Sequence, residues 1–344
     1  MKTSPALVLE RPYQASYREI DLTPMTPDTI LCRTTLSAIS SGTDMKTWRG
    51  QQHPEQCWYP LVPGYESVGV VEQVGPEAKT SLKPGDRVMI NECRQFANVC
   101  AAWGGSVKYV LKNSVTAPSP FDYMVKIPDN VSDRDAVLAY LACVALKGAK
   151  RLTYRPNETI LIVGAGMVGL SAAQIVKILN PSAKVIVIDR SAFRCEIARH
   201  YADQVFLADG SEVAKLAEAT DGKKADKIIE CSGHSEVVGT LHRYLKDGGW
   251  AHDDEPGHIH LQGDYPEPIT LDSWHRWFTK NCTVTMTCAL GPGTKEQILQ
   301  WMSEGKFNTT HLPTELWKAE QGHEAFTYKQ TKGDAVFKVL LEWS

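Results

Sequence analysis

The stretch ETILIVGAGMVGLSAAQIVKIL, residues 158–179, decides the fold class of this chain. Its apolar run at 160–163 is typical of a buried strand, and the residues that follow the last glycine have helical spacing. Between them, Gly164, Gly166 and Gly169 follow the G-x-G-x-x-G spacing. A strand, a tight glycine turn and a helix in this order predict a dinucleotide-binding unit of an open α/β sheet.

Each glycine of this turn has a separate physical reason. Gly164 permits the tight turn, Gly166 leaves room for a pyrophosphate against the backbone, and Gly169 lets helix and strand pack closely. Met167 and Val168 belong to the helix N-terminus, which offers unpaired N–H groups and a partial positive charge to phosphates. We therefore predict that these five residues bind the cofactor; the alternative is a glycine-rich turn without a ligand.

The end of the next strand, VIVID, predicts which cofactor is used. A carboxylate at Asp189 accepts hydrogen bonds from the adenosine ribose hydroxyls and repels a 2′-phosphate, which favours NAD. The guanidinium of Arg190 complicates the choice, because it would pair with such a phosphate. NADP therefore stays open as the alternative.

The texture of the sequence changes at about Glu158. Residues 28–150 contain short β-branched runs separated by Gly and Pro, a pattern typical of a barrel-like all-β unit. A helix is expected over 132–152, with Ser132 or Asp133 as its cap. Beyond Glu158, strand-like and helical segments alternate, which indicates a parallel sheet with crossover helices. The closing AVFKVLLEWS is predicted to be a strand that rejoins the first domain.

Size and composition set limits on the function. A length of 344 residues suggests about two domains. A net charge of −3 does not favour binding to nucleic acid or to an anionic membrane. The sequence contains no run of about 18 apolar residues, so no transmembrane helix is expected. The N-terminus lacks the apolar core of a signal peptide. The nine scattered cysteines fit reduced thiols, so a cytoplasmic location is expected.

Several motifs occur along the chain in one order: SSGTD at 40–44, PGYESVGVVEQVG at 63–75, LKPGDRV at 82–88, VGAGMVG at 163–169, VIDR at 187–190 and IIECSG at 228–233. Together they resemble the medium-chain dehydrogenase/reductase superfamily over nearly the whole chain. The resemblance implies an α/β protein. A GroES-like β-barrel catalytic domain is expected at 1–152 and 290–344, and a doubly wound Rossmann sheet that binds NAD at 153–289.

The positions at which zinc-using members of the superfamily place their ligands carry other residues. Ser41 stands in place of a cysteine and Tyr65 in place of a histidine; Cys143 remains, with Glu66 as an available carboxylate. A catalytic zinc takes about three protein ligands, and a hydroxyl or a neutral phenol is a poor one. We therefore predict that no metal is bound. The segments around 37–50 and 59–69 look most like the zinc-lacking branch that includes bacteriochlorophyllide a dehydrogenase.

Without zinc, hydrogen-bond donors must stabilise the oxygen to which a proton is delivered. The resemblance places Thr43, Lys46 and Tyr65 at the substrate. Tyr65 or Lys46 is predicted to be the proton donor and acceptor, with Thr43 as a relay, and the choice between the two stays open. The alternatives are a phenol that fills the space of the metal, a solvated lysine and a turn threonine.

Two further groups belong to the predicted cofactor site. Arg194 lies where relatives often have a basic residue near the adenosine ribose; the alternative is a helix-surface arginine. Ser232 and Gly233 end the strand that is expected to pass beneath the nicotinamide, because sites in open α/β sheets lie at the carboxyl ends of strands.

Other segments give weaker hints. Trp48, Trp58 and Tyr59 suggest a ring-bearing or extended apolar substrate, and Arg49 suggests an anionic group on it. The segment AHDDEPG, 251–257, is an apparent insertion; an exposed polar loop is expected there, with a metal cluster as the alternative.

The predicted function is hydride transfer, without zinc, between NAD(H) and a secondary alcohol or ketone. One rival is an NAD(P)H-dependent quinone or enoyl reductase, which acts on a C=C bond. The other is an NAD-binding protein without turnover. A homodimer or homotetramer is expected by analogy with relatives. The sequence leaves the substrate and the physiological direction open.

Overall fold

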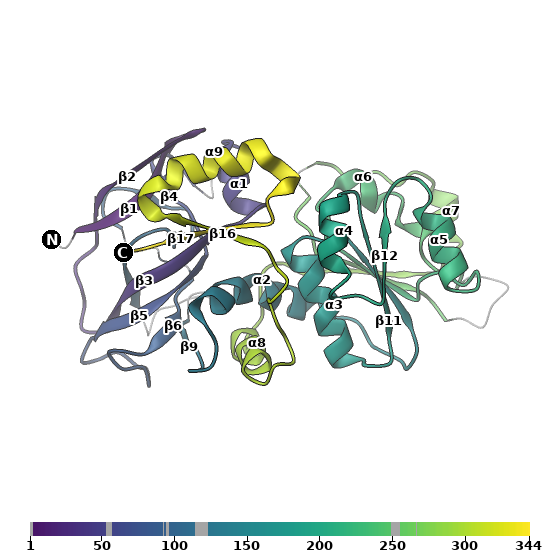
Figure 1. Cartoon of the computed structure of the whole chain (residues 1–344), viewed down its shortest axis with the longest axis horizontal. Coiled ribbons are helices and arrows are strands. Elements are labelled where there is room, and N and C mark those ends of the chain that lie inside the picture. The colour runs from purple at the N-terminus through teal and green to yellow at the C-terminus, as the bar shows by residue number, and fades with distance from the viewer. Residues whose placement is uncertain are drawn as a thin grey trace. The chain divides into compact units, whose positions relative to one another are not determined.

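The computed structural model describes residues 3–52, 57–91, 93, 96–113, 123–248, 255–265 and 267–344. These residues form two compact units, which we describe separately (Figure 1). The first contains Met1–Tyr140 and Lys295–Ser344, and the second contains Leu141–Thr294. The domain ranges expected from the sequence, 1–152 with 290–344 and 153–289, stay a prediction. No helix among the described residues is long and apolar enough to cross a membrane.

The first unit is built mainly from antiparallel strands in two sheets. One sheet has the order β2-β1-β4-β7, and the other has the order β16-β17-β3-β5-β6-β9, with β8 paired to β3. The strands are β1 (Thr3–Arg11), β2 (Gln14–Asp21), β3 (Thr29–Ile39), β4 (Leu61–Val62), β5 (Glu66–Val74), β6 (Arg87–Met89), β7 (Cys100–Ala101), β8 (Tyr109–Asn113), β9 (Val125–Lys126), β16 (Thr314–Lys318) and β17 (Lys338–Glu342).

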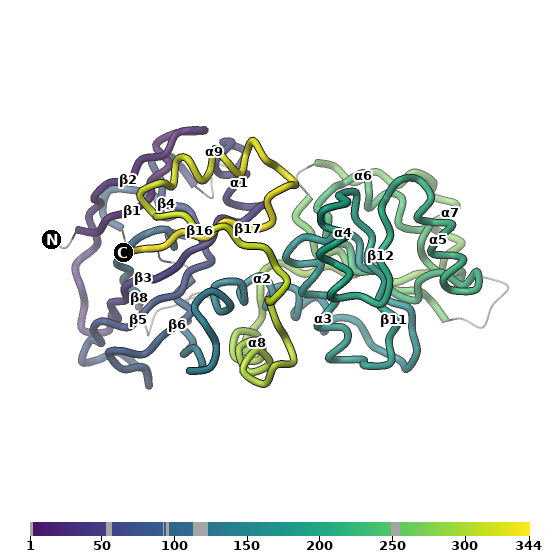
Figure 2. Tube along the Cα trace, in the orientation of Figure 1, coloured from purple at the N-terminus to yellow at the C-terminus, as the bar shows by residue number. Residues whose placement is uncertain are grey.

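The C-terminal strand returns to the first unit, as the sequence predicted. β17 pairs antiparallel with β3, with Leu340 opposite Ala38, and Ala38 is in turn opposite Glu66 of β5. Figure 2 traces the end of the chain into this sheet. Three strands far apart in sequence therefore share one face at this point, because directly opposite residues project to the same side of a sheet.

Few helices accompany these sheets. They are α1 (Thr43–Trp48), α9 (Gly322–Lys332) and two 3-10 turns, Ala319–Gln321 and Gly333–Ala335. Two further helices, α2 (Asp133–Ala149) and α8 (Thr294–Ser303), contain the points at which the chain passes from one unit to the other. Ser132 caps α2, since its Oγ accepts the N–H of Asp135 at 3.1 Å. The rings of Trp48 and Phe326 stack at 5.1 Å between centroids, which fixes α1 against α9.

The second unit is a six-stranded sheet in the order β12-β11-β10-β13-β14-β15, and every pair in it is parallel. Its elements are β10 (Thr159–Val163), α3 (Met167–Leu179), β11 (Lys184–Asp189), α4 (Ala192–Ala198), β12 (Gln204–Leu207), α5 (Glu212–Ala219), β13 (Lys227–Glu230), α6 (Ser235–Val238), the 3-10 turn Leu241–Arg243, β14 (His258–Leu261), α7 (Trp274–Phe278) and β15 (Thr283–Met286). The predicted fold class, a GroES-like unit and a Rossmann-like parallel sheet, is confirmed.

The strand order reverses at β10, because the chain goes to β11 and β12 on one side and to β13, β14 and β15 on the other. The central strands are apolar and buried on both faces, as parallel strands covered by helices require. Ligands of open α/β sheets bind at the carboxyl ends of strands beside such a reversal. The fold therefore directs attention to the residues that follow β10 and β13.

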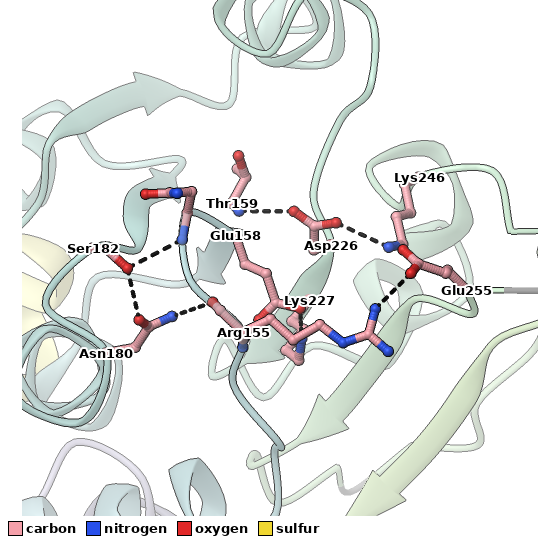
Figure 3. A network of polar contacts seen from close by, with 10 residues as sticks. Arg155, Glu158, Thr159, Asn180, Ser182, Asp226, Lys227, Lys246 and Glu255 are labelled. Carbon is pink, nitrogen blue, oxygen red and sulfur yellow. Dashed lines mark hydrogen bonds and ion pairs between the residues drawn. The ribbon is translucent and has the colours of Figure 1, made fainter. Parts of the chain in front are cut away.

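The opposite, amino-terminal edge of this sheet is closed by ion pairs (Figure 3). Glu158, just before β10, pairs with Lys227 at the start of β13, and both side chains are largely buried. Asp226 accepts the backbone N–H of Thr159 at 2.8 Å and pairs with Lys246 at 2.9 Å. These contacts join the starts of β10 and β13, at the edge opposite the carboxyl ends of the strands.

Candidate active site

The glycine turn after β10 has the geometry that its spacing predicted. Gly164 has a φ of +96°, a conformation that favours glycine. A Cβ on Gly164 would lie 2.8 Å from the backbone nitrogen of Ser232, and one on Gly169 would lie 1.8 Å from the carbonyl oxygen of Gly164. Gly166 is the N-cap residue of α3, which Met167 begins. Side chains at the first and third glycines would therefore force backbone apart.

Asp189, the last residue of β11, is held beside this turn. Its Oδ2 accepts the N–H of Ala165 at 2.6 Å and its Oδ1 accepts the N–H of Ser191 at 2.8 Å. The carboxylate is only partly buried. Because each carboxylate oxygen has about two acceptor sites, both retain capacity for a ligand hydroxyl.

The two arginines of the predicted cofactor site differ in position. Arg194 lies in α4, and its Nη1 is 3.3 Å from the place a Cβ on Gly166 would take. Its guanidinium therefore lies over the glycine turn. Arg190 follows Asp189 directly and is exposed. The structure thus brings Arg194 to the turn and leaves Arg190 at the surface.

The end of β13 carries a buried carboxylate that our sequence reasoning did not select. Glu230 is fully buried and accepts hydrogen bonds from the N–H and hydroxyl of Ser232 and from the phenol of Tyr265. Burial raises the pKa of Glu230, and these donors oppose the shift. Gly233, with φ +73°, turns the chain away. The sequence signal for this carboxylate was a charged residue directly after the apolar pair Ile228 and Ile229.

Tyr65 places a buried phenol next to the start of α1 in the first unit. Tyr65 is buried, and its hydroxyl is hydrogen bonded to the side chains of Ser40 and Thr43. Its ring lies 4.9 Å from the ring of Tyr140 and 6.2 Å from that of Trp103, between centroids. The structure therefore brings together two of the three residues predicted to be catalytic and adds Ser40, which sequence reasoning missed.

Lys46 follows Thr43 by three residues on α1, and residues at this spacing share one face of a helix. Both are partly exposed, whereas Asp44, Met45 and Thr47 between and beside them are buried. The face that carries Thr43 and Lys46 is therefore the accessible face of this short helix.

The environment of Tyr65 keeps its hydroxyl protonated. Burial raises the pKa of Tyr65 well above its usual value, and the nearby carboxylates of Glu66 and Asp44 raise it further, although the hydroxyls of Ser40 and Thr43 lower it. A neutral phenol is a hydrogen-bond donor at every physiological pH. Tyr65 is thus a neutral hydrogen-bond donor in the resting site, because its environment disfavours the phenolate form.

Asp44 connects the elements around this phenol. Its Oδ2 accepts the N–H of Ser40 at 2.7 Å and its Oδ1 accepts the N–H of Gly64 at 3.1 Å, while its own N–H donates to Ser40 Oγ at 2.9 Å. Asn91 Nδ2 donates to the carbonyl of Tyr65 at 3.1 Å. These bonds fix the backbone on both sides of Tyr65.

The donor set at the expected metal positions does not fit zinc. Ser41 is exposed, Tyr65 keeps its proton, and Glu66 is bound by the ammonium of Lys338 at 2.5 Å. Cys143, in α2, is buried in the second unit. A zinc ion takes thiolate, imidazole or free carboxylate ligands. In the described ranges, no three His, Cys, Asp or Glu side chains form a group that could hold a metal ion.

The insertion at 251–257 gives little support to a metal cluster. His252, Asp253 and Asp254 lie outside the described residues. Glu255 pairs with Arg155 at 2.8 Å (Figure 3). The histidines that follow the insertion, His258 and His260, belong to β14, where both bond to Thr285 of β15.

The aromatic residues that suggested a ring-bearing substrate have structural roles. Trp48 is buried in the core of the first unit, and the hydroxyl of Tyr59 donates to the carbonyl of Thr47. Arg49, the hint of an anionic group, donates to Gln330 at 2.8 Å. Only Trp58 of this set is largely exposed. The ring of Trp48 therefore serves packing, and a ring-bearing substrate stays a prediction.

Comparisons with known proteins agree with this architecture. The profile of the alcohol dehydrogenase GroES-like domain matches residues 26–129, and that of the zinc-binding dehydrogenases matches residues 167–252. The probable D-xylulose reductase A of Aspergillus clavatus is 29% identical over 300 residues, which cover 82% of this chain and 80% of the relative. D-xylulose reductase A of Aspergillus oryzae is 27% identical over 301 residues, 82% of this chain and 80% of the relative.

Solved structures show the same fold. An Escherichia coli oxidoreductase/dehydrogenase of unknown specificity superimposes with a TM-score of 0.84 at 21% identity, and both chains are covered completely. A short chain alcohol dehydrogenase from Escherichia coli, solved with NADH, gives 0.82 at 22% identity with complete coverage of both chains. The profiles and the fold define an oxidoreductase that joins a GroES-like domain to a Rossmann-like sheet. The chain belongs to the medium-chain zinc-binding-type dehydrogenase family. Its closer placement in the zinc-lacking branch stays a prediction.

Proposed function

We propose that this chain is a zinc-independent, NAD(H)-dependent alcohol dehydrogenase or ketone reductase. The observation that carries the proposal is Tyr65, a buried neutral phenol hydrogen bonded to Ser40 and Thr43. It stands where the resemblance places a histidine ligand in zinc-using relatives. A fixed hydrogen-bond donor stabilises charge on a reacting oxygen, which is the task of the Lewis acid in zinc enzymes.

The second unit supports a nicotinamide dinucleotide as the cofactor. The bare backbone at Gly164 and Gly166 and the N-terminus of α3 suit a pyrophosphate. Asp189 retains acceptor capacity for ribose hydroxyls, which supports NAD, whereas Arg190 and Arg194 would favour NADP. When bound, such a cofactor supplies hydride chemistry at its nicotinamide ring.

The residues of the first unit would manage the proton. In the direction of reduction, the carbonyl carbon gains hydride, and Tyr65 Oη gives its proton to the carbonyl oxygen. The Thr43 hydroxyl, already bonded to the phenol, replaces that proton. Lys46, on the same partly exposed face of α1, would return a proton to Thr43 from the solvent side. Oxidation of an alcohol would reverse these transfers.

The relatives suggest where to search for the substrate. Two of them are named as D-xylulose reductases, and a structural neighbour from Bacillus subtilis is a 2R,3R-butanediol dehydrogenase. We infer that small polyols and their ketones are the first substrates to test, within the wider class of secondary alcohols. The homodimer or homotetramer and the cytoplasmic location stay predictions.

The test combines a chelator with a substrate panel. Purified protein is treated with a chelator and assayed with NADH and NADPH against D-xylulose, 3-hydroxy-2-butanone, an enone and a quinone. The proposal predicts reduction of a carbonyl with NADH at a rate that neither chelation nor added zinc changes. A rate that requires zinc contradicts it, as does turnover of the enone or quinone alone. Tight binding of NADH without any turnover would favour a non-catalytic role.

A further inference from the structure

Lys338 places a buried ammonium against Glu66, the residue that follows Tyr65 in sequence. Lys338 begins β17 and is 2% exposed, and its Nζ is 2.5 Å from Oε1 of Glu66, which is 0% exposed. The pairing of β17, β3 and β5 explains the contact. Leu340, Ala38 and Glu66 lie opposite one another across the three strands, and Lys338, two residues before Leu340, projects to the same side.

The Lys338–Glu66 pair balances negative charge that is buried in this part of the first unit. Two fully buried carboxylates, those of Asp44 and Glu66, lie close enough to Tyr65 to act on its hydroxyl. Asp44 is satisfied by backbone N–H groups, which bring no full charge. Lys338 acts on both carboxylates, and Lys329 from α9 also acts on Glu66. Oε2 of Glu66 is buried and accepts no hydrogen bond from the described residues.

Donation of a proton by Tyr65 places negative charge on its oxygen until Thr43 replaces the proton. Like charges nearby oppose that step, and they do so strongly where water is excluded. Burying a carboxylate without a cation is also costly in itself. A cation fixed on Glu66 therefore serves both the fold and the reaction.

We propose that Lys338 is a positioning residue of the Tyr65 site, whose buried ammonium holds the Glu66 carboxylate in a neutral pair so that the phenol gives up its proton beside balanced charge. This inference rests on the proposed function of Tyr65 as a proton donor.

The test compares two substitutions that separate charge from packing. Lys338→Met keeps the length of the side chain and removes its charge, whereas Lys338→Arg keeps the charge and changes the shape. In Lys338→Met, Glu66 is expected to be protonated at lower pH and charged at higher pH. Its kcat should therefore fall by about tenfold per pH unit on the alkaline side, a limb that wild type and Lys338→Arg lack. The KM of the substrate should change by less than about threefold.

Two further variants complete the test. Lys227→Met removes another buried ammonium, which pairs with Glu158 far from the site in sequence and in a different unit (Figure 3). It should lower the melting temperature without creating a new alkaline limb. Glu66→Gln/Lys338→Met removes both charges; it should fold even where Lys338→Met does not, and its pH profile should again lack the limb.

The outcomes separate the inference from the proposed function. If wild type turns over no carbonyl substrate, the proposed function fails. If wild type is active and Lys338→Met has the wild-type pH profile, or is more active than Lys338→Arg at every pH, only the role of Lys338 is overturned. A limb that persists in Glu66→Gln/Lys338→Met overturns it as well, because Glu66 would then not be its source.

Discussion

Two carboxylates of this molecule, Asp189 and Glu66, are held in opposite ways. Asp189 stands at the end of a parallel strand, partly exposed, and its oxygens accept the backbone N–H groups of Ala165 and Ser191. Glu66 is fully buried and is bound by an ammonium from a strand more than two hundred residues away in sequence. The first arrangement leaves acceptor capacity for a ligand. The second closes the carboxylate off and lets its charge act only on its neighbours.

Glu230 lies between these extremes and shows what the difference depends on. It is as buried as Glu66, yet within the described part of the chain it is bonded to hydroxyls and backbone N–H and forms no ion pair. Burial raises the pKa of Asp44, Glu66 and Glu230, and of these three acids only Glu66 has a directly bonded ammonium, as Glu158 has in the second unit. The bonded lysine therefore distinguishes Glu66 from the other two acids.

The largest effect on turnover is expected at Tyr65, the phenol next to Glu66. Tyr65→Phe keeps the ring and removes the proton, so kcat should fall by about a hundredfold or more while binding of NADH stays unchanged. Stopped-flow or steady-state rates with the best carbonyl substrate, and NADH fluorescence titration, provide the measurement. Tyr154→Phe is the matched control, since the hydroxyl of Tyr154 donates to the carbonyl of Ala149 within the second unit. Equal rates for Tyr65→Phe and wild type would exclude the phenol as donor.

A smaller effect is expected at the open carboxylate. Asp189→Asn leaves an amide that cannot accept at both ends, so affinity for NADH should fall by about tenfold and the preference over NADPH should shrink. Asp203→Asn is the matched control. Asp203 also accepts a backbone N–H, that of Val185 at 2.7 Å, but at the start of β11. Cofactor titrations of both variants decide the matter, and an unchanged NADH-to-NADPH ratio in Asp189→Asn would contradict the assignment.

The two sites also differ in how far the sequence could predict them. The cofactor turn is local: Gly164, Gly166 and Gly169 lie within six residues, and backbone sterics alone require glycine there. Asp189 follows from the periodicity of one strand. Both could therefore be predicted from spacing, as could the parallel sheet and the return of the last strand.

The Tyr65 site is not local, and so it was predicted only in part. The resemblance indicated Thr43, Lys46 and Tyr65, but the partners that set the charge of the phenol come from separate elements. Ser40 follows β3, and Lys338 begins β17, where it stands before an apolar run. No spacing rule links position 338 to position 66; only the order of strands in the sheet does. The packing role of Trp48 could not be predicted from spacing either, because its partner Phe326 belongs to α9.

The smallest effect concerns a polar ladder in the second unit that serves stability. His260 is fully buried in β14, with Nδ1 2.9 Å from Thr285 Oγ1 and Nε2 3.1 Å from Thr287 Oγ1. Burial lowers the pKa of His260 to about 4. The unfolded chain then binds the extra proton between its usual pKa of about 6.5 and pH 4, so stability must fall as the pH falls through that window.

For a single group this linkage amounts to under about 1 kcal/mol between pH 7 and pH 6, and it grows below pH 6. His260→Gln keeps a polar side chain and removes the titration, so its unfolding free energy should depend less on pH across this window than that of wild type. Urea denaturation at pH 7, 6 and 5 measures the slope for both proteins. Identical slopes would mean that His260 is protonated equally in the folded and unfolded chains. His260 would then be accessible to solvent protons, like the partly exposed Asp189 and unlike the buried Glu66.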